Sequence, residues 1–158
     1  MPVSLDRYDH RILAALSTDA RISITQLAQD IGLSKTPVAA RIKRLETEGL
    51  ITGYRAIVSP ERLGLGHIAF VEVKLGDTRE AALSKFNDAV RRIPEIEACH
   101  MIAGEYDYLM KVRTSSIETY RRVMGEQISA LPFIRSTSTR VAMETIVDQT
   151  NPHFSETD

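Results

Sequence analysis

The amino-acid sequence predicts an α+β fold in two parts. Apolar residues recur at helical spacing through residues 6–48, whereas after Leu50 runs of β-branched and aromatic residues alternate with helical patterns. A stretch that contains Pro60, Gly64 and Gly66 separates the two parts and has the composition of a connector. We therefore expect a helical domain at 1–54, a connector at 55–66, an α/β-alternating domain at 67–148 and a polar tail at 149–158.

Three helices are expected in the first domain. Asp6 is a suitable N-cap for a helix over residues 6–16, in which apolar side chains follow a helical period. A short second helix, residues 25–30, ends at Gly32. Ser34 then caps a third helix that runs to Glu48 and stops at Gly49. Two helices joined by so short a turn have the spacing of a helix-turn-helix.

The second domain is expected to alternate strands and helices. Residues 50–59, "LITGYRAIVS", suggest short strands or a hairpin. Beyond the connector, the order of patterns is β-α-β-β-α-β, the ferredoxin-like arrangement. Its segments are a strand at 67–75, a helix at 79–93, strands at 96–103 and 108–113, a helix at 117–131 and a long strand at 136–147.

Composition excludes several classes of protein. With 43% hydrophobic and 26% charged residues, the 158-residue chain is typical of a folded domain rather than a disordered one. Cys99 is the single cysteine, which rules out an intramolecular disulfide framework, and no apolar run is long enough to span a bilayer. The N-terminus is polar and of mixed charge, unlike a secretion signal. We expect a cytoplasmic protein.

The strand at 96–103 suggests self-association. Ile96, Ala98 and Ile102 alternate along it with Cys99, Met101 and Ala103, so both faces of the strand carry apolar side chains. Helices would cover one face of the sheet only, and a second copy of the chain is the simplest cover for the other. We expect a dimer at minimum.

Basic residues are concentrated on the third predicted helix, although the formal net charge of the chain is only −1. Four cations fall within ten residues, and no acid interrupts them before Glu46. At 100° per residue, Val38, Ile42 and Leu45 lie within about 60° of one another and form the inward stripe. Small or basic side chains lie opposite them, a surface suited to the major groove of DNA. A solvated helix face is the simpler explanation of a lone basic run, but the helix-turn-helix context favours DNA binding. The candidate DNA-binding residues are Ser34, Lys35, Thr36, Pro37, Ala40, Arg41, Lys43 and Arg44.

Three segments resemble one family. "LDRYDHRIL", "SITQLAQDIGLSKTPVAARIKRLETEGLITGYRA" and "IAGEYDYLMKV" are similar to the leucine-responsive and asparagine-operon regulators, the Lrp/AsnC family of transcription factors. The resemblance extends from about Leu5 to Val147. It implies a winged helix-turn-helix joined to a ferredoxin-like (RAM/ACT-like) domain that dimerises, assembles further into octamers or similar, and binds an amino acid.

The loop "AGEYDYL" is the candidate effector site. Gly104 permits a positive φ, and Asp107 could accept hydrogen bonds from an α-ammonium group. A hairpin turn would use the same residue types for conformational reasons alone. The resemblance implies that this loop lines a pocket between dimers. The candidate residues are Gly104, Tyr106 and Asp107, then Met101, and Thr137 and Thr139 from a neighbouring subunit. Leucine, another branched-chain amino acid, proline and lysine all remain open as effectors.

No catalytic set, phosphate-binding loop or metal-ligand spacing stands out, so we expect neither an enzyme nor a metal or other cofactor. Cys99 and His100 are adjacent on a strand and would point to opposite faces. The sequence thus predicts a DNA-binding regulator that senses an amino acid. A ligand-independent, architectural DNA-compacting protein is the alternative, and an amino-acid-binding subunit of a metabolic enzyme is a weaker one. The operator, the regulated genes and the choice between activation and repression are not predicted.

Overall fold

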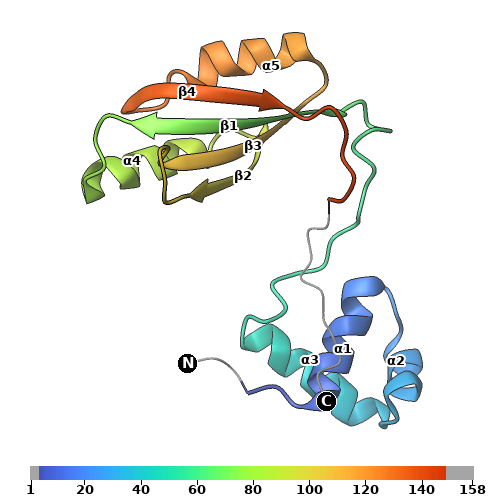
Figure 1. Ribbon diagram of the computed structural model, residues 1–158. Helices are drawn as coiled ribbons and strands as arrows, with labels where there is room; N and C mark the ends of the chain where they lie inside the picture. Colours follow the sequence, from blue (N-terminus) through green and yellow to red (C-terminus); the bar gives the residue numbers. More distant parts are fainter. Residues whose placement is uncertain (1–3, 149–158) are drawn as a thin grey trace. The chain divides into compact units, whose positions relative to one another are not determined.

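The computed structural model describes residues 4–148 and divides the chain into two compact units (Figure 1). The boundary between the units falls between Ile57 and Val58. The predicted polar tail, 149–158, lies outside the described residues. Among residues 4–148, no helix combines the length and the apolarity needed to cross a membrane.

The N-terminal unit contains the three predicted helices, α1 (Arg7–Thr18), α2 (Ile24–Ile31) and α3 (Lys35–Thr47). Asp6 caps α1 in a capping box, in which its side chain accepts from the Asp9 N–H and the Asp9 side chain accepts from the Asp6 N–H. The three helices pack around one apolar core, which consists of Ile12, Leu13, Leu27, Ala28, Ile31, Val38 and Leu45. The predicted helix-turn-helix is therefore confirmed.

The segment between α3 and the first strand differs from expectation. No strand forms over residues 50–66, so the predicted short strands or hairpin at 50–59 are wrong for this structure. Apolar side chains of the segment face solvent instead: Ile57 is 85% exposed and Val58 60% exposed. A strand needs a neighbouring strand to pair its backbone groups, and β-propensity alone does not supply one.

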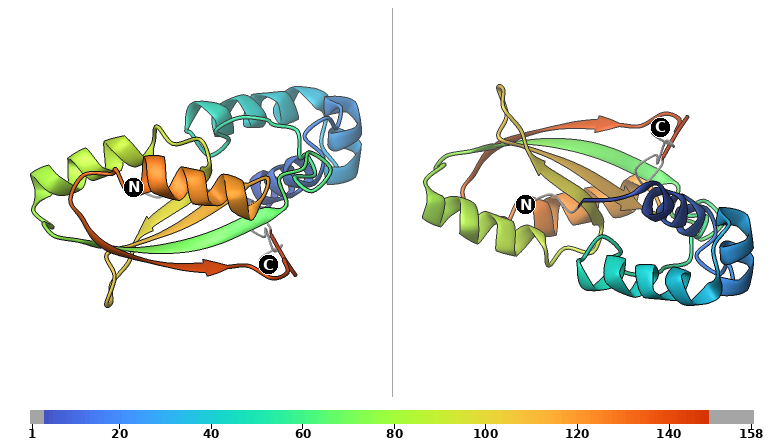
Figure 2. Two further views of the ribbon diagram at one scale, coloured as in Figure 1. Left: turned by 90° about the horizontal axis from the view of Figure 1, so that it is seen from above. Right: turned by 90° about the horizontal axis from the view of Figure 1, so that it is seen from below.

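The second unit has the predicted β-α-β-β-α-β order. Its elements are β1 (His67–Leu75), α4 (Glu80–Val90), β2 (Ile96–Met101), β3 (Tyr108–Thr114), α5 (Ile117–Val123) with a π-helical turn η1 (Met124–Ile128), and β4 (Ile134–Val141). The strands form an antiparallel sheet in the order β2-β3-β1-β4. Both α4 and α5 lie on one face of this sheet (Figure 2). The ferredoxin-like arrangement is confirmed.

Four elements of the second unit end earlier than predicted, among them α4, at Val90 rather than residue 93, and β2, at Met101 rather than residue 103. The helix expected over 117–131 changes to a π-helical turn after Val123, and Ile128 at the end of that turn is fully buried. The last strand, expected to reach residue 147, stops at Val141. Val141 pairs with Ala69, and the Ala142 N–H still donates to the Ile68 carbonyl at 2.9 Å, but in this register β1, which starts at His67, offers no partner to residues 144–147.

A register shift on β2 changes which side chains share a face. A bulge between Ile96 and Ala98 sets Ile96 opposite Val112, which belongs to the core under the helices. Ile96 and Cys99 therefore pack against the same core, and the simple alternation used to predict a dimer is wrong.

The face of the sheet away from the helices is largely polar. It carries ion pairs, Glu72 with Arg140 and Glu97 with Lys111 and Arg113, around a partly exposed Phe70. A dimer can still use this face, but charge complementarity as well as apolar burial would have to stabilise it.

Candidate nucleic-acid interface and ligand loop

The turn between α2 and α3 is fixed by local hydrogen bonds. Gly32 ends α2 in the left-handed conformation (φ 76°), and the Leu33 N–H donates to the Ala28 carbonyl at 2.9 Å. From α1, the Arg11 guanidinium donates to the last carbonyls of α2, at 2.7 Å to Asp30 O and 3.3 Å to Ile31 O. These bonds satisfy backbone groups that the end of α2 would otherwise leave free, and they set the direction in which α3 leaves the turn.

One face of α3 is buried and the opposite face is open. Val38 and Leu45 are fully buried and Ile42 is half-buried. The predicted residues Ser34, Lys35, Thr36, Ala40 and Lys43 are exposed, and Pro37 is half-buried. The Ser34 side chain makes no capping hydrogen bond, which leaves N–H groups at the start of α3 available to an anion.

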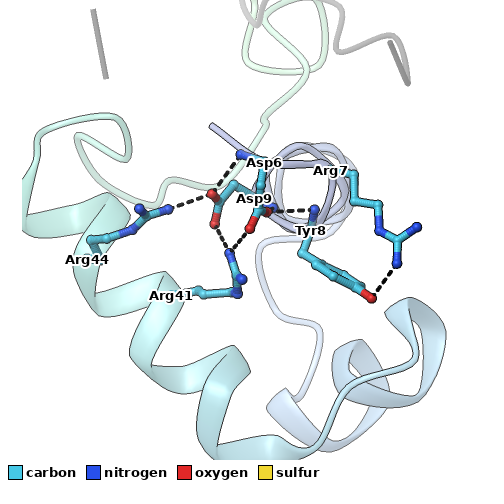
Figure 3. Close-up of polar contacts among 6 residues, drawn as sticks. All are labelled: Asp6, Arg7, Tyr8, Asp9, Arg41 and Arg44. Carbon is cyan, nitrogen blue, oxygen red and sulfur yellow. Dashed lines mark hydrogen bonds and ion pairs between the residues drawn. The ribbon is translucent and has the colours of Figure 1, made fainter. Parts of the chain in front are cut away.

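Arg41 and Arg44 lie elsewhere than expected. Both turn toward the N-terminal end of α1, where Asp9 is only 1% exposed (Figure 3). Arg41 Nη1 lies 2.8 Å from Asp9 Oδ1, and Arg44 Nη2 lies 2.5 Å from Asp9 Oδ2. Arg41 Nη1 also lies 2.8 Å from Asp6 Oδ2. Arg44, expected on the helix face opposite the buried stripe, instead directs its guanidinium to a buried carboxylate, and its predicted contact with DNA stays a prediction.

The same contacts control ionisation of the acids. Burial raises the pKa of Asp9, but hydrogen bonds from the Asp6 N–H and from both guanidinium groups outweigh it, and the resulting pKa is below the ordinary value. The pKa of Asp6 is lowered chiefly by the hydrogen bond from the Asp9 backbone. Both carboxylates are thus ionised at neutral pH and offset positive charge on α3.

Sequence reasoning missed Asp6 and Asp9 as members of this surface. A signal was present, since two acids three residues apart on one helix match two arginines three residues apart on another. Helix-wheel reasoning on α3 alone ignored the neighbouring helix, and so it counted all four cations as free.

The predicted ligand loop joins β2 to β3. Gly104 has a φ of 157°, so the predicted positive φ is confirmed. The Asp107 carboxylate accepts from the Leu75 N–H at 2.7 Å and from Lys74 Nζ at 3.2 Å. The loop backbone is tied down too, because the Asp107 N–H donates to the Val73 carbonyl and the Ile102 N–H to the Asp107 carbonyl, both at 2.9 Å. Asp107 therefore anchors the loop to β1, whatever else it binds.

The other predicted effector residues do not all gather around this loop. Tyr106 is half-buried within it, and Met101 at the end of β2 is 58% exposed. Met101 borders a hollow of about 250 Å³, whose other lining residues are Asn87, Val90, Arg91, Cys99 and Tyr108. Thr137 and Thr139 lie on β4, and β1 separates them from β3 within one chain. Thr139 Oγ1 lies 2.6 Å from the Tyr120 hydroxyl.

Comparison with known proteins matches both units. Residues 5–52 match the family described as winged helix-turn-helix DNA-binding, and residues 68–152 match the Lrp/AsnC ligand binding domain. A proline dehydrogenase transcriptional activator of Rhodobacter capsulatus is 59% identical over 148 residues, which cover 94% of this chain and 96% of that protein.

Solved structures agree with this match. An AsnC family transcriptional regulator from Agrobacterium tumefaciens superposes with a TM-score of 0.90 at 30% identity, over 94% of this chain and 97% of that one. The transcriptional regulator NMB0573 of Neisseria meningitidis, solved as a complex with L-Met, gives a TM-score of 0.86 at 27% identity, over 93% and 95% of the two chains.

Proposed function

This chain belongs to the Lrp/AsnC family of DNA-binding transcriptional regulators, and we propose that it activates a proline dehydrogenase gene in response to an amino acid, with proline as the first candidate. The support for the gene is the 59% identity to a regulator of that name along nearly the whole chain. The support for proline is chemical logic, since an enzyme that consumes proline is useful when proline is present. Leucine, other branched-chain amino acids and lysine are the competing effectors.

The exposed face of α3 is the observation that carries the DNA-binding part of the proposal. Lys35 and Thr36 lie in the first turn of α3, and Lys43 lies about two turns further along the same face. All three side chains are exposed, as is the small Ala40. Small side chains let the helix backbone approach the major groove, and the lysines can neutralise phosphates. In a two-fold dimer, two such helices would read half-sites about one or more helical turns apart.

The loop between β2 and β3 is the proposed effector site, completed by a second copy of the chain. A carboxylate has about four lone-pair positions, and the Asp107 carboxylate accepts two hydrogen bonds, so an α-ammonium group can still be accepted there. Gly104, Tyr106 and Met101 would border the ligand, with Thr137 and Thr139 reaching it from a neighbouring subunit. This arrangement requires at least a dimer, and an octamer would supply several such interfaces.

Ligand binding between subunits would shift the population of assembly states and so the set of half-sites engaged together. The coupling is reciprocal: a ligand that changes DNA affinity must itself bind more tightly or more weakly when DNA is present. No change in assembly size or DNA affinity with any of the twenty amino acids would defeat this part of the proposal.

Fluorescence anisotropy with duplex DNA from upstream of a proline dehydrogenase gene tests the DNA surface. Lys43→Ala should weaken binding and flatten the slope of log K against log[salt] by about 0.9, the value for one lost phosphate contact. Lys85→Ala is the matched control, because Lys85 is an exposed lysine on α4 in the other unit. Equal behaviour of the two variants would contradict the assignment, and uniform protection of unrelated DNA in a footprint would favour the architectural alternative.

A thermal-shift screen of the twenty amino acids tests the effector, because a ligand that binds only the native state raises stability. Proline should give the largest shift. Asp107→Asn, which keeps an acceptor for the Leu75 N–H but loses the charge, should reduce the shift, whereas Asp88→Asn on the exposed surface of α4 should not. A proline response that Asp107→Asn leaves unchanged would place the site elsewhere.

A further inference from the structure

We propose that Asp9 is a positioning residue of the DNA-binding surface, which withholds Arg41 and Arg44 from DNA phosphates and leaves Lys35 and Lys43 as the cationic contacts of α3. The inference rests on the proposed function in one respect, that α3 is the helix that meets DNA. The inference goes beyond the proposed function because it assigns different roles to neighbouring cations of α3: the lysines contact DNA, and the arginines do not.

The first argument is the burial and saturation of the Asp9 carboxylate. Asp9 is 1% exposed, its Oδ1 accepts from Arg41, and its Oδ2 accepts from Arg44 and from the Asp6 N–H at 3.1 Å. Moving either guanidinium to a phosphate would leave a buried charge with too few partners, and such a charge is costly in a protein interior. A DNA phosphate therefore has to draw a guanidinium away from a carboxylate that the two guanidinium groups otherwise shield from water.

The second argument is the additional hold on Arg41. Its guanidinium contacts Asp6 as well as Asp9, and it lies 5.5 Å from the centre of the Tyr8 ring (Figure 3). All three groups come from the first turns of α1 and flank the guanidinium together. Arg41 is accordingly only 27% exposed, against 40% for Arg44.

The third argument is the exposure of the two lysines. Lys35 and Lys43 are exposed, and neither makes an ion pair among the contacts described for residues 4–148. A phosphate can approach them without breaking any internal contact. Of the four cations in residues 35–44, the two arginines are thus bound by Asp6 and Asp9, whereas the two lysines are open to solvent.

The division has a consequence for the strength and salt dependence of DNA binding. Each phosphate contact contributes about −0.9 to the slope of log K against log[salt], so two free cations per helix give about −1.8 instead of the −3.6 expected for four. Phosphate contacts carry no sequence information, so the affinities for specific and non-specific DNA are lowered by the same factor, whereas base contacts from the exposed face of α3 are retained. Asp9 therefore lowers total affinity and leaves the ratio of specific to non-specific affinity to the base contacts.

The test compares neighbouring positions on the same helix in the full-length protein. Lys43→Gln and Arg44→Gln each remove one positive charge, and Arg44→Gln leaves Arg41 on Asp9 to keep that carboxylate paired. With the proline dehydrogenase upstream duplex, Lys43→Gln should flatten the salt slope by about 0.9 and Arg44→Gln should leave it unchanged. If Arg44→Gln flattens the slope as much as Lys43→Gln, Arg44 reaches a phosphate and the inference is wrong. If neither variant changes it, α3 is not the DNA-binding helix, and the proposed function falls together with the inference.

Asp9→Asn gives the converse result. Loss of the charge should release guanidinium groups to phosphates, steepen the salt slope by up to about 1.8 and raise the affinities for the upstream duplex and a scrambled duplex alike at low salt. Asp19→Asn is the control, because it makes the same charge change at the exposed C-cap of α1. Circular dichroism confirms that each variant is folded before titration. A slope for folded Asp9→Asn equal to that of Asp19→Asn would overturn the inference, and the comparison of Lys43→Gln with Arg44→Gln decides it if Asp9→Asn does not fold.

Discussion

Stability of the N-terminal unit should depend on Asp9 far more than on other acids of the same unit. Asp9→Asn removes a charge that accepts hydrogen bonds from two guanidinium groups and from the Asp6 N–H. Hydrogen bonds to charged groups contribute about 1.5–3 kcal/mol each, and the amide oxygen of Asn preserves part of this. Three such bonds would sum to about 4.5–9 kcal/mol, but both arginines reach solvent and can be rehydrated, so we expect about 2–3 kcal/mol for the substitution as a whole.

Acid should abolish the difference in stability between the wild-type protein and Asp9→Asn. The pKa of Asp9 is lower in the folded state than its ordinary value of 3.8. A group whose folded pKa is depressed contributes stability that is complete above its unfolded pKa and is lost as the pH falls through its folded pKa. The cost of Asp9→Asn should therefore be constant above about pH 5 and shrink as the pH falls below 3.8, where Asp9 of the unfolded chain becomes protonated, until folded Asp9 is protonated at its lower pKa.

Urea unfolding should be monitored by hydrogen exchange in peptides from α1 to α3. This readout gives the free energy of unfolding of the N-terminal unit separately from that of the sheet domain. A loss of 2–3 kcal/mol lowers the Tm of so small a unit by roughly 8–24 °C. Asp19 lies on the surface, where its side chain accepts a hydrogen bond from the Arg21 N–H. Asp19→Asn should therefore change stability by no more than about 0.5 kcal/mol. Equal costs for Asp9→Asn and Asp19→Asn at pH 7, or a cost that persists unchanged at pH 3, would refute the reasoning.

Three further outcomes are expected. Leu45→Ala should destabilise the N-terminal unit by about 2–5 kcal/mol, since Leu45 is fully buried among the three helices, and hydrogen exchange should show the loss in α1–α3 rather than in β1. Gly32→Ala should cost about 1–2 kcal/mol in urea unfolding, because Gly32 has a φ of 76° and an added Cβ would meet no neighbour, so that backbone strain alone sets the cost. Burial raises the pKa of the Cys99 thiol to about 11, so at pH 8 Cys99 should react with a maleimide about 100-fold more slowly in the native protein than in 6 M guanidinium chloride.

The sequence was sufficient for elements whose signals are local. Asp6 and Gly32 mark helix ends by their own chemistry, and α1 begins and α2 ends beside them. The apolar alternation of β1 and the turn residues after β2 likewise depend only on near neighbours. The fold follows from the order of these elements, because few topologies accommodate β-α-β-β-α-β.

The errors all concern partners that are distant in the sequence. The last strand cannot reach residue 147 because β1 begins at His67, and no pattern within residues 136–147 reveals where the partner strand begins. Ile96 joins the core because a bulge against β3 shifts the register. Residues 50–59 have strand propensity but no strand beside them, and Arg44 has helix-surface spacing but a buried acid beside it.

In both candidate sites, a charged side chain that could bind a ligand already forms an ion pair within the protein. Whether a ligand can replace the internal partner depends on how deeply the group left behind is buried. Arg44 cannot leave Asp9 without cost, since the guanidinium groups shield a carboxylate that is only 1% exposed. Asp107 is different, because its partner Lys74 is 35% exposed and can turn its ammonium into solvent. The proposal that a ligand ammonium replaces Lys74 at Asp107 and the proposal that a phosphate does not replace Asp9 at Arg44 therefore depend on one physical criterion, the burial of the group left behind.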